Sequence, residues 1–328
     1  MTPTRIAIIG AGWAAQKHVS ALRDETDVAI VGIASRSLEH AAILAAQAGS
    51  RARPWSDYRQ MLDAGGIDAV ITCLPPAERG APELDAIDRG LHLLVEKPIG
   101  LDRETPARIG QRIAETGVIV AVGYQWRYLD LVDRARELLA GHPPQLVLGT
   151  WLGSTPSAEW WVRRDGSGGQ VLEQATHILD LMRTLVGECE AVAALAVDAP
   201  ASERGVADIS DVSTTMLRFD TGAIGSLATS RLLTDVHRVG IECFSAGQAL
   251  SLELVPHRLV LGRGTQTSVI AGTDDLAATY HAQDRAFVDA LRGGRVPVRS
   301  TWADALRTHE LAMRATELAV TAPATIRS

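Results

Sequence analysis

The sequence predicts an α/β protein with two domains, and three observations support this fold class. Short apolar runs alternate with helical stretches up to about residue 125, which is typical of a parallel sheet covered by helices on both faces. Beyond that point, strands follow one another directly and are separated by turn signals such as Asp220-Thr221-Gly222, which favours a mainly antiparallel sheet. A length of 328 residues also suits about two domains. We therefore place one domain at residues 1–125 and the other at residues 126–328.

The first domain is expected to alternate strands and helices, because each of its apolar runs is short enough to be a buried strand of a parallel sheet. The expected strands are residues 5–9, 29–34, 69–73, 91–95 and 118–122. The expected helices are residues 14–23, 38–48, 82–89 and 103–115. In sheets of this kind, ligands bind outside the carboxyl ends of the strands.

The second domain is expected to be built on a large open sheet. The expected strands are residues 146–152, 191–197, 212–219, 223–229, 239–244, 249–254 and 259–261. One strong helix, at residues 170–186, interrupts them, and two late helices are expected at residues 275–292 and 302–320. An open sheet with apolar side chains on both faces needs cover, and helices can cover only one face. We therefore expect a second copy of the chain on the other face, in a homodimer or a homotetramer.

The composition excludes several classes of protein. The net charge is −7 and no run of lysine or arginine occurs, so nucleic-acid binding is not expected. No apolar stretch is long enough to span a membrane, and the N-terminus lacks the pattern of a signal peptide. The cysteines Cys73, Cys189 and Cys243 are scattered without CxxC spacing, which argues against a disulfide framework or a cysteine-based zinc site. These features predict a cytoplasmic protein.

A glycine-rich loop closes the first strand and opens the first helix. It reads Gly10-Ala-Gly12-Trp13-Ala14-Ala15, the G-x-G-x-x-A pattern of a Rossmann dinucleotide-binding domain. Gly10 permits the tight turn, Gly12 lets a pyrophosphate approach the backbone, and Trp13 and Ala14 begin the helix whose free N–H groups face the phosphates. The alternative is a tight strand–helix turn without a ligand.

The end of the second strand indicates which dinucleotide is bound. An NAD site usually has Asp or Glu there to bind the ribose 2′-hydroxyl, but this chain has Ser35 and Arg36. Hydroxyls and a guanidinium suit a 2′-phosphate, so the sequence favours NADP(H) over NAD(H). The alternative is a solvated loop in which Ser37 caps the next helix.

Lys97 is the strongest candidate for a catalytic side chain. Its segment, Glu96-Lys97-Pro98, follows the fourth strand and so lies at the ligand-binding edge of the sheet. The chain has only two lysines, Lys17 and Lys97, and uses arginine for nearly all its positive charge. A lysine amine can give and take a proton, whereas arginine stays protonated. Glu96 is expected to orient Lys97 or to pack locally, and the alternative for Lys97 is an ordinary surface position.

A second group of candidates follows Gly168-Gly169. Glu173 and His177 are four residues apart, so they are expected to share one face of the helix, with Asp180 near that face. His177 can transfer a proton or bind the reacting hydroxyl, and Glu173 can orient it or bind a neighbouring hydroxyl. A structural histidine is the alternative. No cluster with metal-ligand spacing supports a metal, so none is expected.

The stretch from residue 153 to residue 169 is a long loop, and long loops in compact domains are usually functional. It carries Trp160, Trp161 and Arg164. Aromatic faces and guanidinium groups suit a polyhydroxylated ring, so these three residues are candidates for substrate binding. The tryptophans are equally well explained as a hydrophobic contact between domains or subunits.

These motifs resemble those of the Gfo/Idh/MocA oxidoreductases over nearly the whole chain. The matching segments, in family order, are Gly10-Ala-Gly12 with His18, Leu74-Pro75-Pro76, Glu96-Lys97-Pro98, Gly123 to Tyr128, Gly169 to Asp180, and Phe287 to Arg292. The resemblance implies a Rossmann domain followed by a domain with an open antiparallel sheet that commonly forms the subunit interface.

The resemblance also implies roles for individual residues. Lys97 and His177 correspond to the catalytic lysine and histidine of the family, and Glu173 stands where many members have Asp. Arg127 corresponds to the second basic residue of a motif after the fifth strand and is therefore a candidate for substrate binding. Leu74 and Pro75 are expected at the cofactor, as is Glu96.

The function that these residues favour is transfer of a hydride between a nicotinamide cofactor and a secondary alcohol or ketone. The substrate is expected to be a sugar, an amino sugar, a cyclitol or a glycoside. Two alternatives remain at this point. One is an NAD-dependent glycoside hydrolase that acts through transient oxidation, and the other is a non-catalytic nucleotide-binding partner, against which intact Lys97 and His177 argue.

Overall fold

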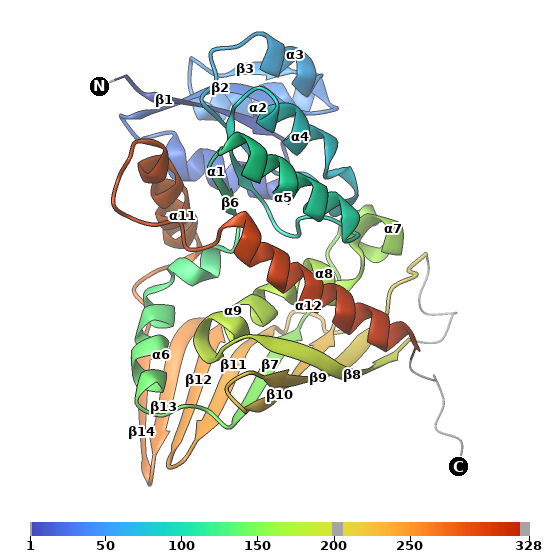
Figure 1. Ribbon diagram of the computed structural model, residues 1–328, viewed down its shortest axis with the longest axis vertical. Coiled ribbons are helices and arrows are strands. Elements are labelled where there is room, and N and C mark those ends of the chain that lie inside the picture. The colour runs from blue at the N-terminus through green and yellow to red at the C-terminus, as the bar shows by residue number, and fades with distance from the viewer. Residues whose placement is uncertain (1, 199–205, 322–328) are drawn as a thin grey trace. The chain divides into compact units, whose positions relative to one another are not determined.

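The computed structural model describes residues 2–198 and 206–321 (Figure 1). The chain forms two compact units. The first contains Met1–Tyr128 and Leu276–Leu306, and the second contains Leu129–Asp275 and Arg307–Ser328. The sequence prediction differs from this division, because it places every residue after 125 in the second domain. The difference arises because Phe287 and Val288 are fully buried in the core of the first unit.

The first unit is built on a six-stranded sheet in the order β3-β2-β1-β4-β5-β6. All its pairings are parallel, as the alternation of strands and helices predicts. The strands are β1 (Thr4–Ile9), β2 (Val28–Ala34), β3 (Arg53–Trp55), β4 (Ala69–Thr72), β5 (His92–Val95) and β6 (Val120–Val122).

Helices cover both faces of this sheet, and alternate side chains of each strand point to opposite faces. Ile6 and Ile8 of β1 belong to one core cluster, whereas Ala7 and Ile9 belong to the other. The helices are α1 (Trp13–Leu22), α2 (Leu38–Ala48), α3 (Tyr58–Asp63), α4 (Ala81–Ile87), α5 (Glu104–Thr116) and α11 (Leu276–Leu291), with 3₁₀ turns η1 (Pro76–Glu78) and η2 (Gln125–Tyr128). Residues of α1, α2 and α11 pack on the Ile6 face, and residues of α3, α4 and α5 pack on the Ala7 face.

The second unit is built on an eight-stranded sheet in the order β14-β13-β12-β11-β7-β10-β9-β8. Only β7 and β10 pair in parallel, so the sheet is mainly antiparallel, as predicted. The strands are β7 (Leu146–Leu152), β8 (Cys189–Val197), β9 (Val212–Phe219), β10 (Ile224–Ser230), β11 (Arg238–Ser245), β12 (Gln248–Leu254), β13 (His257–Arg263) and β14 (Gln266–Ala271).

In the described part of the chain, the helices of this unit lie on one face of the sheet (Figure 1). They are α6 (Asp130–Ala140), α7 (Arg164–Ser167), α8 (Gln170–Glu173), α9 (Thr176–Val186) and, from Arg307 onward, α12 (Trp302–Thr321), with the 3₁₀ turn η3 (Glu159–Val162). The first residues of α12, up to Leu306, belong to the first unit. The helix α9 contacts β7 and β11, and α6 contacts β12 and β13 (Figure 1). Leu217 and Phe219 of β9 are buried on the helical side, whereas Met216 is exposed on the other.

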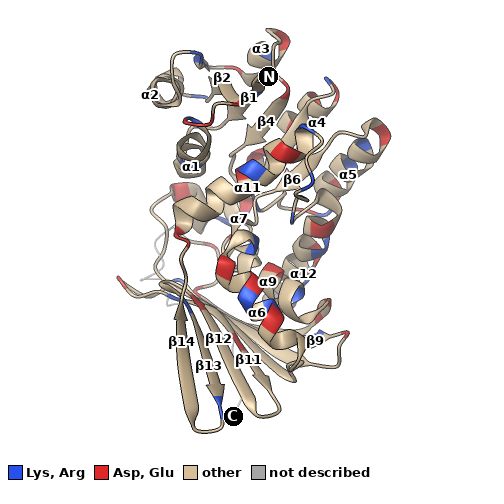
Figure 2. Ribbon diagram, turned by 90° about the vertical axis from the view of Figure 1, so that its left-hand side faces the viewer, with Lys and Arg blue, Asp and Glu red and all other residues tan. Residues whose placement is uncertain are grey.

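The open face carries exposed apolar side chains among charged ones such as Arg218 and Glu190. Leu195, Met216 and Ile224 lie on it with about 60% of their surface exposed. In Figure 2 the strands of this sheet are mostly tan, whereas helices such as α5 and α12 carry bands of charge. A hollow of about 230 Å³ lies on the same face, lined by residues of β11, β12, β13 and β14. Within the described ranges, no helix is long and apolar enough to cross a membrane.

The elements β3, α3, α6 and β14 were not predicted from the sequence, and neither were the short helix α7 and the 3₁₀ turns η1, η2 and η3, of which α7 and η3 lie in the expected loop at residues 153–169. The strand β14 has hardly any buried side chains, because it is the exposed edge of the sheet. It therefore lacks the alternating apolar pattern of a half-buried strand. The helix α6 does show a helical apolar pattern, with Leu131, Val132, Ala135 and Leu139 buried on one face. That signal was available in the sequence.

Candidate active site

The glycine-rich loop has the geometry that a dinucleotide requires. Gly10 has φ +111°, and a Cβ there would lie 2.2 Å from the carbonyl oxygen of Cys73, so only glycine fits. A Cβ on Gly12, by contrast, would meet no atom within 4 Å, so this side of the loop is open. The helix α1 begins at Trp13, with Gly12 as its N-cap and no capping side chain. Its first N–H groups are therefore available to an anion such as a pyrophosphate.

A cavity of about 370 Å³ lies beside the end of β2 in the first unit. Ser35 and Arg36 line it, as do Leu74 and Pro75, so four residues predicted at the cofactor come together. Its volume is within the range of small-molecule sites. The residues that line it and that the sequence analysis did not single out include Asp57, Tyr58, Arg59 and Glu78.

The charges around this cavity are mixed. The side chain of Arg36 is 87% exposed, and its Nη1 lies 3.3 Å from Oε1 of Glu78. Arg59 lies near Asp85, with 2.9 Å between its Nε and the carboxylate. The cavity therefore offers two guanidinium groups to an anionic ligand. Each guanidinium now pairs with an acidic side chain, and an anionic ligand could take the place of that acid.

Lys97 follows β5 at the carboxyl edge of the sheet and is half-buried. Its backbone N–H donates to Oε2 of Glu96 at 3.2 Å, and the Lys97–Pro98 peptide is cis. Glu96 is buried, with only 4% of its surface exposed. Lys97 and the glycine-rich loop thus belong to the same edge of the same sheet.

Three residues that were not predicted to lie in the site, His18, Asp284 and Tyr280, form a cluster with Glu96. His18 of α1 lies 3.2 Å from Glu96 through Nε2 and 2.8 Å from Asp284 of α11 through Nδ1. The ring of Tyr280 of α11 packs edge-on against that of His18, with 5.2 Å between the centroids, and burial raises the pKa of Tyr280. The only signal in the sequence was the position of His18 in the family motif, because Asp284 and Tyr280 are more than 180 residues away from Glu96.

The expected single helix over residues 170–186 is wrong. The chain forms α8 and α9 with a break at Gln174 and Ala175. The N–H of Ala175 donates to the carbonyl of Gln170, five residues back, and the N–H of His177 donates to Gln174 instead of Glu173. The four-residue helical repeat is therefore interrupted, and the argument that Glu173 and His177 share one helical face does not hold.

Aromatic side chains hold Glu173 and His177 in the second unit. Trp161 is almost completely buried, and its indole N–H donates to Oε2 of Glu173 at 2.6 Å. The ring of Trp151 stacks on that of His177, with 6.1 Å between the centroids and 16° between the planes. His177 is buried, whereas Glu173 is half-buried. Trp161 thus contacts Glu173, a predicted site residue. Contact of Trp161 with substrate stays a prediction, and so does contact of the half-buried Trp160 with substrate.

Asp180 is buried away from these aromatic contacts. Its Oδ1 accepts a hydrogen bond from the hydroxyl of Thr308 of α12 at 2.9 Å. Arg183 donates to the same hydroxyl at 2.5 Å. Asp180 therefore attaches α9 to α12 within the second unit.

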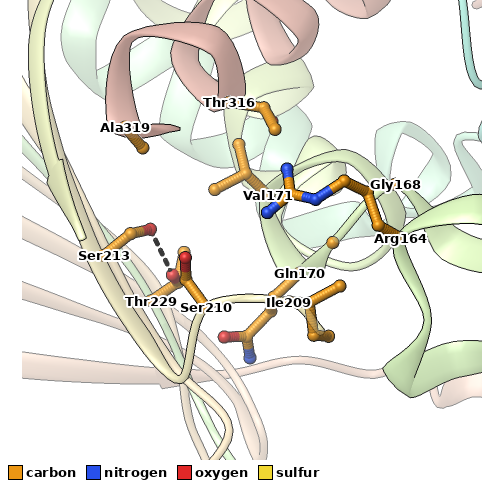
Figure 3. A pocket seen from close by; sticks show the side chains of 11 residues that line it. Arg164, Gly168, Gln170, Val171, Ile209, Ser210, Ser213, Thr229, Thr316 and Ala319 are labelled. Carbon is orange, nitrogen blue, oxygen red and sulfur yellow. Dashed lines mark hydrogen bonds between the residues drawn. The ribbon is translucent and has the colours of Figure 1, made fainter. Parts of the chain in front are cut away.

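The two arginines predicted to bind substrate have partners of their own. Arg127, in the first unit, is buried, donates to the carbonyl of Arg299 at 2.6 Å and pairs with Asp304. Arg164, in the second unit, is exposed and lines a cavity with Val171 and Thr316 (Figure 3). That cavity holds about 30 Å³, which is roughly the volume of one water and too small for a sugar. The roles of both arginines in substrate binding stay predictions.

The structure therefore groups the predicted residues by unit. The glycine-rich loop, the cavity at Ser35 and Arg36, and Lys97 belong to the first unit, and Trp161, Glu173 and His177 belong to the second. Among the described residues, no three His, Cys, Asp or Glu side chains are grouped so that they could hold a metal ion.

Two sequence profiles match this chain. One, described as an oxidoreductase family with an NAD-binding Rossmann fold, matches residues 4–124. The other, described as the GFO/IDH/MocA C-terminal domain, matches residues 143–246. The two matches fall in the two halves of the chain that carry the two sheets.

Individual proteins are similar over most of their length. The chain is 27% identical over 256 residues to scyllo-inositol 2-dehydrogenase (NAD(+)) of Bacillus subtilis (strain 168), covering 74% of this chain and 73% of that enzyme. It is 24% identical over 298 residues to D-xylose 1-dehydrogenase (NADP(+)) 2 of Haloferax volcanii, covering 88% and 90%. The fold is similar to that of levoglucosan dehydrogenase in complex with NADH, with a TM-score of 0.86, 20% identity and 97% of each chain covered. Together with the loop and the sheet edge described above, these matches show that the chain belongs to the Gfo/Idh/MocA family of NAD(P)-binding oxidoreductases.

Proposed function

We propose that this oxidoreductase oxidises a secondary alcohol of a sugar, an amino sugar, a cyclitol or a glycoside, and reduces the matching ketone. The observation that carries the proposal is the position of Lys97, which follows β5 at the same sheet edge as the glycine-rich loop. The names of the relatives support the substrate class, since they include dehydrogenases of scyllo-inositol, of D-glucosides and of levoglucosan.

The proposed chemistry assigns one role to each side chain. The bound nicotinamide supplies the acceptor for the hydride. Lys97 accepts the proton of the hydroxyl as its carbon is oxidised, and returns it in the reverse direction. His177 shares this proton or holds the carbinol, and Glu173 binds a neighbouring hydroxyl.

A substrate screen tests this proposal. Cyclitols, free sugars and glycosides, with scyllo-inositol and levoglucosan among them, are incubated with NAD⁺ and with NADP⁺, and the nicotinamide absorbance is followed in both directions. We expect a signal with at least one polyol. Release of sugar from a glycoside without any net change in absorbance would favour the glycoside hydrolase instead, and binding of nucleotide with neither reaction would favour the non-catalytic partner.

We further propose that the cofactor is NADP(H) in preference to NAD(H). The support is the cavity at the end of β2, where Ser35, Arg36 and Arg59 stand and where the strand end carries no acid. Changing Arg36 to Ala should raise the Kd of NADP⁺ about tenfold and that of NAD⁺ less than twofold, because only the first has a 2′-phosphate. Fluorescence titration of the protein with each nucleotide measures both values, and an unchanged ratio of the two would remove Arg36 from the site.

We also propose that the open face of the sheet binds a second copy of the chain. The support is the apolar surface of Leu195, Met216 and Ile224 and the hollow next to it. Light scattering should give a dimer or a tetramer, and the double variant Met216→Glu with Ile224→Glu should shift the mass toward that of one chain. A monomer at micromolar concentration in the unmodified protein would contradict this proposal.

A further inference from the structure

The imidazole of His18 lies between two carboxylates in the interior of the first unit. Its Nδ1 is 2.8 Å from Oδ2 of Asp284, and its Nε2 is 3.2 Å from Oε1 of Glu96. His18 and Asp284 have no exposed surface, and Glu96 is 4% exposed. A buried carboxylate needs a charged or hydrogen-bonding partner, and here one imidazole is the partner of two carboxylates.

The surroundings of His18 favour its charged form. Burial by itself disfavours an imidazolium, but the negative charge of Asp284, with a contact to Cys73, raises the pKa of His18 well above its usual value. A charged imidazole donates a hydrogen bond from each ring nitrogen, so each carboxylate can accept one N–H. His18 therefore brings positive charge directly against Glu96.

Glu96 is fixed on its other sides as well. The backbone N–H of Lys97 donates to its Oε2 at 3.2 Å, and the ring of Tyr280 packs edge-on against that of His18. A Cβ on Gly123 would lie 2.8 Å from the carboxyl carbon of Glu96. Gly123 thus leaves the space that the carboxylate occupies.

We propose that His18 and Asp284 are positioning residues for Lys97, and that they act through Glu96. His18 belongs to α1, which begins at the glycine-rich loop, whereas Asp284 belongs to α11. The cluster therefore joins the cofactor loop, the backbone of Lys97 and a helix from late in the chain, all within the first unit. This inference rests on the proposed role of Lys97 in proton transfer.

The variant Asp284→Asn tests the proposal, because it keeps the size of the side chain and removes the charge that keeps His18 protonated. Without the positive imidazolium, the negative charge of Glu96 next to Lys97 is less compensated, so the Lys97 amine should react more slowly with an anhydride. Lys97 and Lys17 are the only lysines in the chain, and both are half-buried. Acetylation by a limiting amount of acetic anhydride, quantified for each lysine by mass spectrometry, therefore gives a ratio that needs no turnover.

We expect the ratio of Lys97 to Lys17 acetylation to fall about threefold in Asp284→Asn. With a polyol from the substrate screen, kcat should fall about tenfold while KM changes less than about twofold, because the change affects the proton acceptor rather than substrate binding. An unchanged ratio in a folded Asp284→Asn protein would overturn the proposal.

Asp27→Asn is the matched control. Asp27 pairs with Arg285, the neighbour of Asp284 on α11, through contacts of 2.8 Å and 3.2 Å. This variant loosens the same helix without changing the partners of His18, so the ratio and kcat should stay within about 1.5-fold of the unmodified protein. Equal losses in Asp27→Asn and Asp284→Asn would mean that packing of α11 alone is responsible, and would refute the positioning role.

Tyr280→Phe decides the matter if Asp284→Asn does not fold, as judged by its thermal melt. The ring of Tyr280 packs edge-on against that of His18, so removing its buried hydroxyl changes the surroundings of His18 and should move the acetylation ratio in the same direction by a smaller amount. No movement in this variant would overturn the proposal. If the acetylation ratio changes in these variants but the unmodified protein oxidises no polyol, the proposed function is refuted and the inference stands, because acetylation requires no substrate.

Discussion

The two groups of candidate site residues are held in different ways. In the first unit, Lys97 follows a buried parallel strand, and its neighbour Glu96 is fixed by charged and hydrogen-bonding partners. In the second unit, Glu173 and His177 stand on either side of a break between two helices and are held by tryptophans. The first group is positioned by the register of a sheet, and the second by packing around an irregular backbone.

This difference fits the different roles proposed for the two groups, proton transfer for the first and substrate binding for the second. In the proposed mechanism, the hydride and the proton move at one geometry whatever the substrate, so the residue proposed to transfer the proton, Lys97, gains from a rigid sheet edge. Substrate rings differ in size and in the orientation of their hydroxyls, so the group that binds them can lie on loops and helix ends. Changes in the first unit should therefore reduce kcat, and changes in the second should affect KM as well.

The largest effect is expected for Lys97→Met, which keeps the length of the side chain and removes the amine. We expect kcat to fall about 10²–10⁴-fold, the usual loss on removing a positioned acid or base. Nucleotide affinity should change little, and Lys17→Met should leave kcat nearly unchanged. Steady-state kinetics and nucleotide titration of the two variants measure this, and a near-normal kcat in Lys97→Met would end the proposed mechanism.

His177→Ala should have a smaller effect if the comparison between the two groups holds. We expect kcat to fall about 10–100-fold and KM to rise if the imidazole, as one of its two proposed roles has it, holds the carbinol and is not the main proton acceptor. His309→Ala is the control, since His309 is also buried and belongs to the same unit. A loss of kcat equal to that of Lys97→Met would show that His177 carries the proton.

Much of the fold followed from local patterns. The apolar runs of the first unit and the turn-separated strands of the second predicted both sheets, because periodicity and turn residues are properties of neighbouring residues. The exposed edge strand β14 was missed because it buries little. The packing of α11 on the first unit could not be predicted either, since it depends on which hydrophobic core buries Phe287 and Val288.

The candidate site likewise has parts that local sequence patterns predict and parts that they do not. The glycine-rich loop and Lys97 could be predicted because each depends on a few consecutive residues next to a strand. The cluster of His18, Glu96 and Asp284 could not, because its members are far apart in the sequence and meet only through packing. The break at Gln174 and Ala175 was also missed, since both residues are compatible with a continuous helix.

The charge of His18 predicts a pH dependence of stability in the first unit. Its unfolded pKa is about 6.5, and its folded pKa is raised by Asp284 despite burial, with Cys73 also in contact and Glu96 and Tyr280 beside it. The stabilisation is therefore fully present below about pH 6.5 and is lost as the pH rises through the folded value.

Urea unfolding at a series of pH values should show this loss. The difference in free energy of unfolding between the unmodified protein and His18→Gln should shrink above pH 6.5, by at most about 1.4 kcal/mol per pH unit. A difference that grows with pH would mean that His18 is neutral in the folded protein.

The smallest effect is expected for Trp161→Phe, which tests whether aromatic contacts position the second group. The change removes the indole N–H that donates to Glu173 at 2.6 Å, so the carboxylate loses a charge-assisted hydrogen bond. We expect KM to rise about fivefold, equivalent to roughly 1 kcal/mol, with little change in kcat. Trp302→Phe is the matched control, since Trp302 is also buried and its N–H donates to the carbonyl of Pro106 at 3.0 Å in the first unit. Both variants should lose similar stability on thermal unfolding, because each leaves a smaller ring in a packed core. If KM rises equally in both, the effect comes from general loosening, and Trp161 has no specific role in holding Glu173.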